Sequence, residues 1–559
     1  MQTVKIPAYE ALAHDIKALG VEAVFGLMSD DTALLVTTLD SMGVPFLGSR
    51  HENNAISMAE GYAAATGKLG IAILGRGPAT ANGIHGAVYA LKSGSPVLLI
   101  FGEASTTSSV NGVGPDTKGF NTLGVLAAAG IKTFTPTEAQ TVRRVANNAI
   151  AAAHHSAVAL LLPMNAQFGE VDYAGDLPEA FKKAPLPAQR ARTPAIHTAA
   201  ALLRQSRKPL IIAGLGAHRS GARDMLIKLA DHIGAALATT LKAKDMFKGH
   251  PFDVGILGSF SHAGGRRLIE QADCVLIFGA GMNQRTTSFG TSLPGDVPII
   301  HVDRVRDNIG RWFHADVALV ADAHLAAEQL LEILPPRPDQ DKPLHSEQMR
   351  AWLADFNMAD EFQPENTPRT MDPRSLAIEL DKLLPVERNV VYDSGNFLQV
   401  LPYVSVPGPA HIKSASDFSS IGMGFGTAIG YARGTPDRTT VLFIGDGSFL
   451  MTMGELETVA REGISLVIVL MNDCAYGAEL HYLKMRSMPV AMSVFPDIDF
   501  APVAESFGFQ GFTVRTLDQL HALAPILANP DGPVLIDCKI NGAIAAPFLL
   551  ETVEHERKK

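Results

Sequence analysis

Residues 444–479 read IGDGSFLMTMGELETVAREGISLVIVLMNDCAYGAE. The stretch starts at the end of an apolar strand, 441–444, and contains a second one, 466–471, with a helical apolar pattern between them. A strand–helix–strand unit of this kind pairs its strands in parallel. Their carboxyl ends, which carry Asp446 and Asp473, therefore meet at the sheet edge where open α/β folds bind ligands.

The two carboxylates at this edge predict a metal-bridged diphosphate site. Two carboxylates and a loop carbonyl suit a hard divalent cation, and Mg²⁺ completes its octahedron with water and phosphate oxygens. Gly447 and Ser448 lead from a Gly-Asp-Gly-Ser turn towards a helix N-terminus, where free N–H groups attract phosphate. The alternative interpretation is an ordinary crossover with a polar turn.

The bulk properties set limits on the function. At 559 residues the chain is too long for one core, and 47% apolar with 19% charged residues is typical of a globular protein. A net charge of −10 argues against nucleic acid or an anionic membrane as the main partner. Three widely spaced Cys outside any CxxC motif indicate a reducing compartment. No signal-peptide or membrane-span pattern occurs, so a cytoplasmic location is expected.

Apolar strand patterns alternate with helical patterns along most of the chain. This alternation predicts parallel sheets with helices on both faces. Polar, proline-bearing stretches at about 177–194 and at 335–373 interrupt it and are expected to be connectors. The fold class predicted is therefore α/β, with three doubly wound, mainly parallel domains at 1–176, 195–335 and 373–545, followed by a tail at 546–559.

The Gly-Asp-Gly-Ser turn followed by Asn472–Asp473 resembles the cofactor motif of thiamine-diphosphate-dependent enzymes, the family of acetolactate synthase, pyruvate decarboxylase, benzoylformate decarboxylase and benzaldehyde lyase. The resemblance covers nearly the whole chain and implies pyrimidine-binding, central and diphosphate-binding domains, in that order. It implies that Asp446, Asp473 and the carbonyl of Ala475 bind Mg²⁺, or alternatively Ca²⁺. It also places Gly445, Gly447 and Ser448 on the cofactor. Family members usually have Asn where this chain has Asp473, so the extra charge either tightens cation binding or marks a modified site.

The segment Arg50–His51–Glu52–Asn53 resembles the family segment whose Glu contacts N1′ of the aminopyrimidine ring. The thiazolium C2 must lose a proton, which the neighbouring 4′-amino group removes as its imino tautomer. A carboxyl sharing a proton with N1′ favours that tautomer, and burial can raise its pKa for this role. Glu52 is therefore expected to be catalytic and to contact the cofactor; without the resemblance, a helix-cap or surface role is the simpler interpretation.

Residues 419–426, SSIGMGFG, resemble the family loop that holds the cofactor bent in a V. The resemblance implies that Met423 is the apolar wedge between the two rings and that the Ile421 carbonyl accepts from the 4′-amino group. A glycine-rich turn into a helix is the alternative. Ser394, Gly395 and Asn396, at another strand end, are expected near the diphosphate.

In this family the cofactor lies between the first domain of one subunit and the third domain of another. The resemblance therefore implies that Glu52 and Asp446 of one site come from different chains. A homodimer or homotetramer with active sites at the subunit interface is expected.

Three further acids are candidates for proton transfer near the reacting carbon. Asp30, with Asp31 as the other candidate, matches the segment where pyruvate decarboxylases carry a catalytic Asp, and Glu479 matches the position of their catalytic Glu. A helix N-cap pair is the alternative for the two aspartates, and a helix-surface residue for Glu479. The His pair of pyruvate decarboxylases is absent from 105–120, and His85 is more simply interpreted as a packing residue than as a substrate contact.

The main functional hypothesis is decarboxylation of a 2-oxo acid, with release of an aldehyde or ligation to a second carbonyl, as in an acetolactate-synthase-like enzyme. Cleavage of a 2-hydroxy ketone or a 2-hydroxyacyl thioester is the second hypothesis. A non-catalytic cofactor-binding homologue is the third. Gly214 and Gly216 follow a strand, but Arg219 replaces the third glycine of a dinucleotide motif, which favours the absence of FAD. The expected partner is a small carbonyl substrate.

Overall fold

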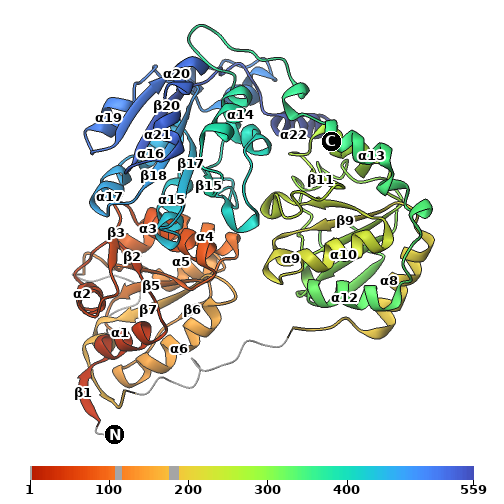
Figure 1. The fold of residues 1–559 in the computed structure, drawn as a ribbon. Coiled ribbons are helices and arrows are strands. Elements are labelled where there is room, and N and C mark those ends of the chain that lie inside the picture. The colour runs from red at the N-terminus through yellow and green to blue at the C-terminus, as the bar shows by residue number, and fades with distance from the viewer. Residues whose placement is uncertain (1–2, 108–115, 176–187, 559) are drawn as a thin grey trace.

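The computed structural model describes residues 3–107, 116–175 and 188–558. These residues form three six-stranded sheets in which every strand pair is parallel. Figure 1 shows three helix-covered bodies, with the first domain below the third and the central domain beside the third. The predicted fold class is confirmed. None of the helices in the described ranges is both long and apolar enough to cross a membrane.

The first domain has the strand order β3-β2-β4-β5-β7-β6. Its strands are β2 (Val24–Gly26), β3 (Phe46–Gly48), β4 (Gly70–Leu74), β5 (Val97–Glu103), β6 (Thr133–Phe134) and β7 (Val158–Pro163). Its helices are α1 (Ala8–Ala18), α2 (Ala33–Ser41), α3 (Glu52–Thr66), α4 (Pro78–Ser93), α5 (Thr122–Ala128), α6 (Val142–Ala153) and α7 (Met164–Phe168). A separate antiparallel pair, β1 (Val4–Pro7) with β8 (Glu170–Tyr173), joins the two ends of the domain and was not predicted.

The central domain has the order β11-β10-β9-β12-β13-β14. Its strands are β9 (Pro209–Ala213), β10 (Ala236–Thr239), β11 (Asp253–Ile256), β12 (Cys274–Phe278), β13 (Ile299–Asp303) and β14 (Val317–Val320). Its helices are α8 (Thr193–Gln205), α9 (Leu215–Arg219), α10 (Arg223–Ile233), α11 (Ala263–Ile269) and α12 (Ala323–Ile333). The connector expected at 335–373 contains α13 (Glu347–Asp355), whereas most of the one expected at 177–194 lies outside the described residues.

The third domain has the order β16-β15-β17-β18-β20-β19. Its strands are β15 (Arg388–Tyr392), β16 (Ile412–Ser414), β17 (Thr439–Gly445), β18 (Leu466–Asn472), β19 (Gln510–Val514) and β20 (Val534–Lys539). Its helices are α14 (Pro373–Leu383), α15 (Met423–Gly434), α16 (Asp446–Thr452), α17 (Glu455–Arg461), α18 (Gly477–Lys484), α19 (Ala501–Glu505), α20 (Leu517–His521), α21 (Ala524–Ala528) and α22 (Pro547–Arg557). Two helices, α16 and α17, stand where the sequence predicted one, and the expected Gly-Asp-Gly-Ser turn is the first turn of α16.

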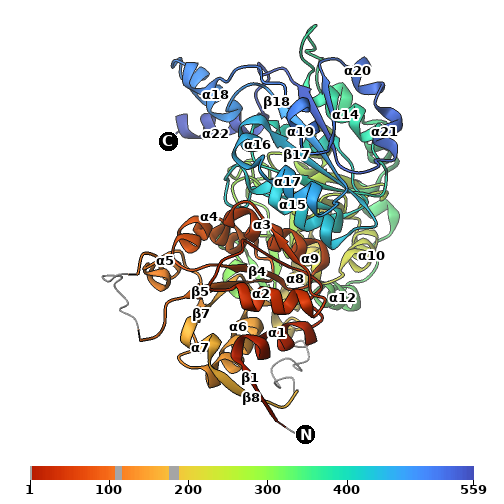
Figure 2. The same ribbon diagram turned by 90° about the vertical axis from the view of Figure 1, so that its left-hand side faces the viewer.

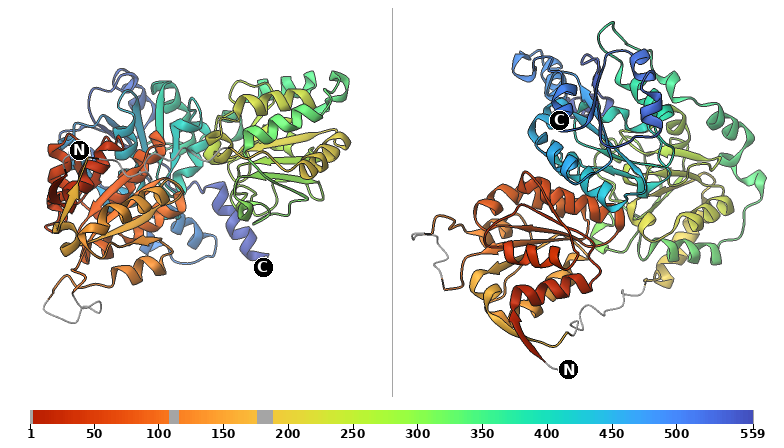
Figure 3. Two further views of the ribbon diagram at one scale, coloured as in Figure 1. Left: turned by 90° about the horizontal axis from the view of Figure 1, so that it is seen from below. Right: turned by 60° about the vertical axis from the view of Figure 1, so that its left-hand side comes forward.

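The first and third domains share one apolar core through α3 and α15. Figures 2 and 3 show these helices at the boundary between the two domains. A Cβ on Gly61 of α3 would lie 2.0 Å from the Thr427 carbonyl oxygen, and one on Gly430 of α15 would lie 1.8 Å from the Met58 carbonyl oxygen. Small residues at these positions let the two backbones approach closely, so the contact fixes the start of α3 against the third domain.

Candidate active site

Asp446 and Asp473 come together at the carboxyl edge of the third sheet, as the sequence predicted. β17 and β18 are paired in parallel register up to Gly445 and Met471, so each strand delivers its aspartate to the same edge. Asp446 is 3% exposed. Burial, and then repulsion from Asp473, raises the pKa of Asp446, and burial also raises the pKa of Asp473. The pair therefore holds a proton unless a cation neutralises it.

The donor set at this edge fits a hard divalent cation. In the loop after β18, the Cys474 carbonyl accepts from the Phe495 N–H and the Tyr476 N–H donates to the Ser493 carbonyl. Ala475 lies opposite Val494 between these bonds, which leaves its carbonyl outside the ladder. No cluster of three or more His, Cys, Asp or Glu suited to a metal occurs in the described ranges. A cation at this edge would therefore rely on two carboxylates and a carbonyl, together with oxygens from water or phosphate.

Two glycines make room for this close approach. A Cβ on Gly477 would lie 2.4 Å from Asp473 Oδ2, and one on Gly447 would lie 2.7 Å from the Tyr476 ring. Both distances are shorter than real carbon contacts, so a side chain at either position would displace the aspartate or the aromatic ring. Glycine is thus required at positions 447 and 477 by space rather than by an unusual backbone angle.

Asp393 holds the loop that leads into α15. It is fully buried at the end of β15 and accepts from the backbone N–H groups of Gly422 (2.8 Å) and Gly424 (3.3 Å). Burial raises its pKa to about 6. The loop positions Ile421 and begins α15 at the buried Met423. Sequence reasoning missed this role of Asp393, although a carboxylate at a strand end was the available signal.

Asn396 lies beside the aspartate pair, but its side chain is already engaged. Its Nδ2 donates to the Ile544 carbonyl (2.9 Å), and its Oδ1 accepts from the Ala546 N–H (2.8 Å). Ser394 and Gly395 precede it and are half-buried at the same edge. The amide therefore fastens the segment before α22, and Ser394 and Gly395 are left as the more accessible members of this predicted cofactor contact.

Glu52 is the first residue of α3 and is buried. His51 caps the helix through Nδ1, which accepts from the Asn53 N–H. Asn82 of α4 donates from Nδ2 to Glu52 Oε2 at 3.1 Å. The structure thus gives Glu52 a defined orientation at a strand end facing the third domain, where Arg50 N donates to Glu455 Oε1 at 2.8 Å.

The neighbouring acids Asp30 and Asp31 have opposite environments. The Asp30 side chain is 79% exposed and pairs with Lys118, which lowers its pKa. Asp31 is 2% exposed and accepts from Arg76 N at 3.0 Å, while its Oδ1 has no hydrogen-bond partner among the described residues. The N-cap of α2 is Thr32, so the alternative of an N-cap pair is wrong.

Two other candidate residues, Glu479 and His85, lie on helices α18 and α4. Glu479 lies in the first turn of α18 and is exposed in the single chain. His85 lies on α4 and contacts Ser420 of the third domain across the domain boundary. Part of the segment examined for a His pair, residues 108–115, lies outside the described residues.

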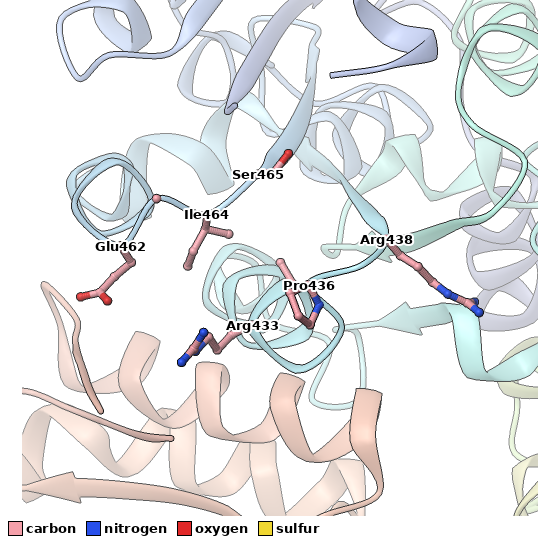
Figure 4. Close-up of a pocket in the computed structure, with 8 residues that line it drawn as sticks. Arg433, Pro436, Arg438, Glu462, Ile464 and Ser465 are labelled. Atoms are coloured by element: carbon pink, nitrogen blue, oxygen red, sulfur yellow. The ribbon is translucent and has the colours of Figure 1, made fainter. Parts of the chain in front are cut away.

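A pocket of about 380 Å³ lies elsewhere in the third domain (Figure 4). Its lining includes Arg433 in the last turn of α15, Pro436 after that helix, and Glu462 and Ile464 before β18. These positions are at the amino edge of β17 and β18, opposite the edge that carries the aspartates. The pocket is therefore separate from the candidate site.

The glycines after β9 have a packing explanation. A Cβ on Gly214 would lie 2.3 Å from the Gly279 carbonyl oxygen, and one on Gly216 would lie 2.8 Å from the Gly279 Cα. Close contact between α9 and the end of β12 thus requires both glycines. Neither glycine needs a nucleotide to account for it.

Three family descriptions match successive parts of the chain. They are "Thiamine pyrophosphate enzyme, N-terminal TPP binding domain" at 7–122, "central domain" at 196–330 and "C-terminal TPP binding domain" at 393–538. The matches follow the three sheets and include the positions of Glu52, Asp446 and Asp473.

Several relatives align with nearly the whole chain. A probable acetolactate synthase large subunit of Methanocaldococcus jannaschii is 26% identical over 97% of this chain and 93% of the relative. A probable sulfoacetaldehyde acetyltransferase of Rhizobium meliloti is 26% identical over 97% of this chain and 96% of the relative. The acetolactate synthase isozyme 2 large subunit of Escherichia coli is 25% identical over 95% of each chain.

Proposed function

Since the chain belongs to the thiamine-diphosphate-dependent enzymes, we propose that it decarboxylates a 2-oxo acid and passes the remaining fragment to a proton or to a second carbonyl. The observation that carries the proposal is the pair formed by the buried Asp446 and the half-buried Asp473 at the carboxyl edge of β17 and β18. The named activities of the acetolactate synthase relatives support this reaction class.

The cofactor, when bound, supplies an electron sink for the carbonyl carbon of the substrate. Asp446, Asp473 and the Ala475 carbonyl would hold Mg²⁺, which would supply positive charge for the diphosphate of the cofactor. Ser394, Gly395, Asn396, Gly445, Gly447 and Ser448 line this end of the site in the proposal. Ile421 and Met423 would hold the rings, and Glu52 would hold a proton at N1′.

Asp31 is the better candidate for proton transfer to the substrate-derived carbon. Its unpartnered Oδ1 is free to take or give a proton, whereas the carboxylate of Asp30 is turned to solvent and paired with Lys118. Arg76 Nε lies 3.5 Å from Asp31 Oδ2, within ion-pair distance. Glu479 stays the second candidate, because a subunit packed against α18 would cover its exposed side chain.

The assembly and compartment follow the family pattern in the proposal. The active sites would lie at the interface of a homodimer or homotetramer, with a small carbonyl compound as substrate. The three cysteines, Cys274, Cys474 and Cys538, are unpaired, which suits a reducing compartment such as the cytoplasm. The packing role of Gly214 and Gly216 supports the absence of FAD, and a visible absorption spectrum of the purified protein tests it.

A second function is favoured by the relatives named sulfoacetaldehyde acetyltransferase. Their name describes the transfer of an acetyl group in a reaction that involves an aldehyde. This reaction differs from the release of a free aldehyde in the main proposal. Cleavage of a 2-hydroxy ketone or a 2-hydroxyacyl thioester is the other alternative, in which the bond beside a carbonyl is broken without loss of CO₂.

The experiment that separates these functions measures CO₂ and carbon products together. Purified protein with thiamine diphosphate and Mg²⁺ is given pyruvate, benzoylformate or benzoin, and CO₂, acetolactate, acyloins and aldehydes are quantified. We expect CO₂ from a 2-oxo acid and none with Asp446→Asn. Cleavage of benzoin without CO₂ from any 2-oxo acid would overturn the main proposal and favour the lyase.

Magnesium binding provides an independent prediction. The folded protein should gain thermal stability from Mg²⁺ with thiamine diphosphate, about 2.7 kcal/mol when the free ligand is about a hundredfold above its dissociation constant. Because the raised pKa values of Asp446 and Asp473 make protons compete with the cation, affinity should rise between about pH 6 and about pH 8. Calorimetric titration at both pH values measures the affinity for Mg²⁺.

Asp473→Asn is the matched variant for this titration, since it removes one charge and keeps the shape. We expect it to weaken Mg²⁺ binding and to flatten the dependence on pH, because only one carboxylate is left to compete for protons. Equal Mg²⁺ affinity at the two pH values in the unmodified protein would contradict cation binding by this pair. Ca²⁺ is titrated in parallel as the larger alternative cation.

A further inference from the structure

One face of α4 carries four polar or aromatic residues that point at the third domain and at the start of α3. Asn82, His85, Tyr89 and Lys92 follow one another at intervals of three or four residues, so they share a face of the helix. Each has a contact described below. None of these four was assigned a role by the proposed function.

Asn82 and its helix neighbours fix the start of α3. The Asn82 amide donates to Glu52 Oε2 at 3.1 Å, and Gly86 N donates to Asn53 Oδ1 at 2.8 Å. A Cβ on Gly83 would lie 3.2 Å from Ile56 Cδ1. The two helices therefore approach closely where Glu52 sits, and the Asn82 amide selects one orientation of its carboxylate.

His85 reaches the loop before α15. Its Nε2 lies 2.5 Å from Ser420 Oγ, and the Ser420 hydroxyl donates to the Ile421 carbonyl at 3.2 Å. A hydroxyl has one hydrogen, so His85 must be the donor in the first contact. Burial, followed by repulsion from His51, lowers the pKa of His85 and favours a neutral ring. The contact with Ser420 then requires the ring proton to be on Nε2. The histidine thus orients Ser420 and, through it, the Ile421 carbonyl.

Tyr89 and Lys92 hold the rest of the same loop. Tyr89 is fully buried and packs with Ala415 and Met423, while its hydroxyl donates to Glu60 at 2.9 Å. Lys92 lies over the Phe418 ring, 5.4 Å from its centroid.

The loop itself needs such support. Ser419 has a φ of 54°, which is unfavourable for a residue other than glycine, and Gly422 has a φ of 90°. Contacts from outside the loop must therefore stabilise its conformation. The contacts from α4 to Ser420, Phe418 and Met423 supply that support.

We propose that the face of α4 formed by Asn82, His85 and Tyr89 positions three protein groups that hold aminopyrimidine rings, Glu52 in one active site of the assembly and Ile421 with Met423 in the neighbouring one. Asn82 orients the Glu52 carboxylate. His85 orients the Ile421 carbonyl through Ser420, and Tyr89 packs against the Met423 side chain and holds it in place. The inference rests on the proposed function, in which those three groups contact thiamine diphosphate. Asn82, His85 and Tyr89 are positioning residues, because they act through other side chains or carbonyls.

The test compares two ligands that differ only in whether they carry the rings. Calorimetry measures binding of thiamine diphosphate with Mg²⁺, and of inorganic pyrophosphate with Mg²⁺, to the cofactor-free protein. His85→Leu removes the donor and keeps the bulk. It should weaken thiamine diphosphate binding by roughly three- to tenfold, the value of one hydrogen bond, and leave pyrophosphate binding unchanged. His85→Gln, which keeps an N–H donor at similar reach, should restore the binding.

Two further variants make the result decisive. Asn82→Ala alters an exposed residue and should show the same selective loss; it decides the question if His85→Leu does not fold. His154→Leu removes a histidine at the end of α6 and should change neither affinity. Equal loss of both ligands, no loss with His85→Leu, or no rescue by His85→Gln would overturn the inference.

The outcome is separable from that of the proposed function. A protein that binds thiamine diphosphate with the expected response to His85→Leu, yet releases no CO₂, counts against the proposed reaction alone. A protein that releases CO₂ and whose affinity is indifferent to His85→Leu counts against the role of α4 alone.

Discussion

Replacing Lys413 by methionine is expected to lower the free energy of unfolding by about 3–5 kcal/mol, because it leaves buried carboxylates without their cation. The Lys413 ammonium lies 2.7 Å from Glu60 Oε1 and 3.3 Å from Asp417 Oδ2. Glu60 is fully buried, and the Lys413 side chain is almost so. Burial alone would lower the pKa of Lys413, but Glu60, Tyr89 and Asp417 outweigh it and raise the pKa, so the residue stays charged.

The loss should be large because this ion cluster joins all three domains. Glu60 belongs to α3, Lys413 to β16, and Asp417 also pairs with Lys242 of the central domain. The Ser95 hydroxyl donates a hydrogen bond of 2.7 Å to Glu60 Oε1. Removing the cation therefore weakens packing between the domains as well as within one.

The measurement is a thermal unfolding midpoint, which should fall by roughly 5–15 °C. Adding Glu60→Gln to Lys413→Met should recover part of the loss, since a neutral amide at position 60 can be buried at lower cost and can still bond Tyr89 and Ser95. Lys382→Met, at an exposed pair on α14, serves as the control and should change the stability by less than about 0.5 kcal/mol. A loss in Lys413→Met no larger than in this control would show that the cluster does not hold the domains together.

The third-domain site could be predicted from the sequence because each step is local. Apolar runs at 441–444 and 466–471 specify buried strands, and the connection between them specifies parallel pairing. Parallel pairing then brings Asp446 and Asp473 together without knowledge of any distant contact. The same reasoning places Glu52 at a strand end, where the structure has it as the first residue of α3.

The choice between Asp30 and Asp31 could not be made in that way. The loop after β2 has no helical or strand period, so the direction of each side chain depends on contacts with residues far along the chain. Arg76 and Lys118 provide those contacts, 45 and 88 residues away. Sequence reasoning could name both candidates, but only the packed loop separates the buried one from the exposed one.

The contacts between domains also could not be predicted from the sequence. Polar residues on one face of a helix ordinarily indicate a solvent face. On α4 that face instead meets the third domain, and His85 bonds a serine 335 residues further on. The simpler reading of His85 as a packing residue on its own helix therefore missed a contact that exists only once α3 and α15 have come together.

Replacing Glu52 by glutamine is expected to lower turnover by roughly a hundred- to ten-thousandfold, the contribution of a positioned acid–base group. Glutamine keeps the shape of Glu52 and can still contact Asn82, so the fold and the thermal midpoint should change little. It cannot share a proton with N1′ as a carboxyl does. Turnover under saturating cofactor is measured beside calorimetric binding of thiamine diphosphate. Unchanged turnover in Glu52→Gln would show that the proposed mechanism is wrong.

The same variant can reveal whether a site is built from one chain or two. In the single chain, the segment carrying Glu52 already faces the third domain through Arg50 and Glu455, whereas the family pattern implies that Glu52 and Asp446 of one site come from different chains.

Co-expressing Glu52→Gln and Asp446→Asn chains with different affinity tags, and purifying through both, isolates the mixed dimer. If sites form between chains, one of its two sites has both native residues, and about half of the normal turnover should return although each variant alone is inactive. If sites form within a chain, both sites stay defective and no turnover returns. Because α4 contacts Glu52 and Ser420 of the same chain, restored turnover would also mean that this helix links two different active sites.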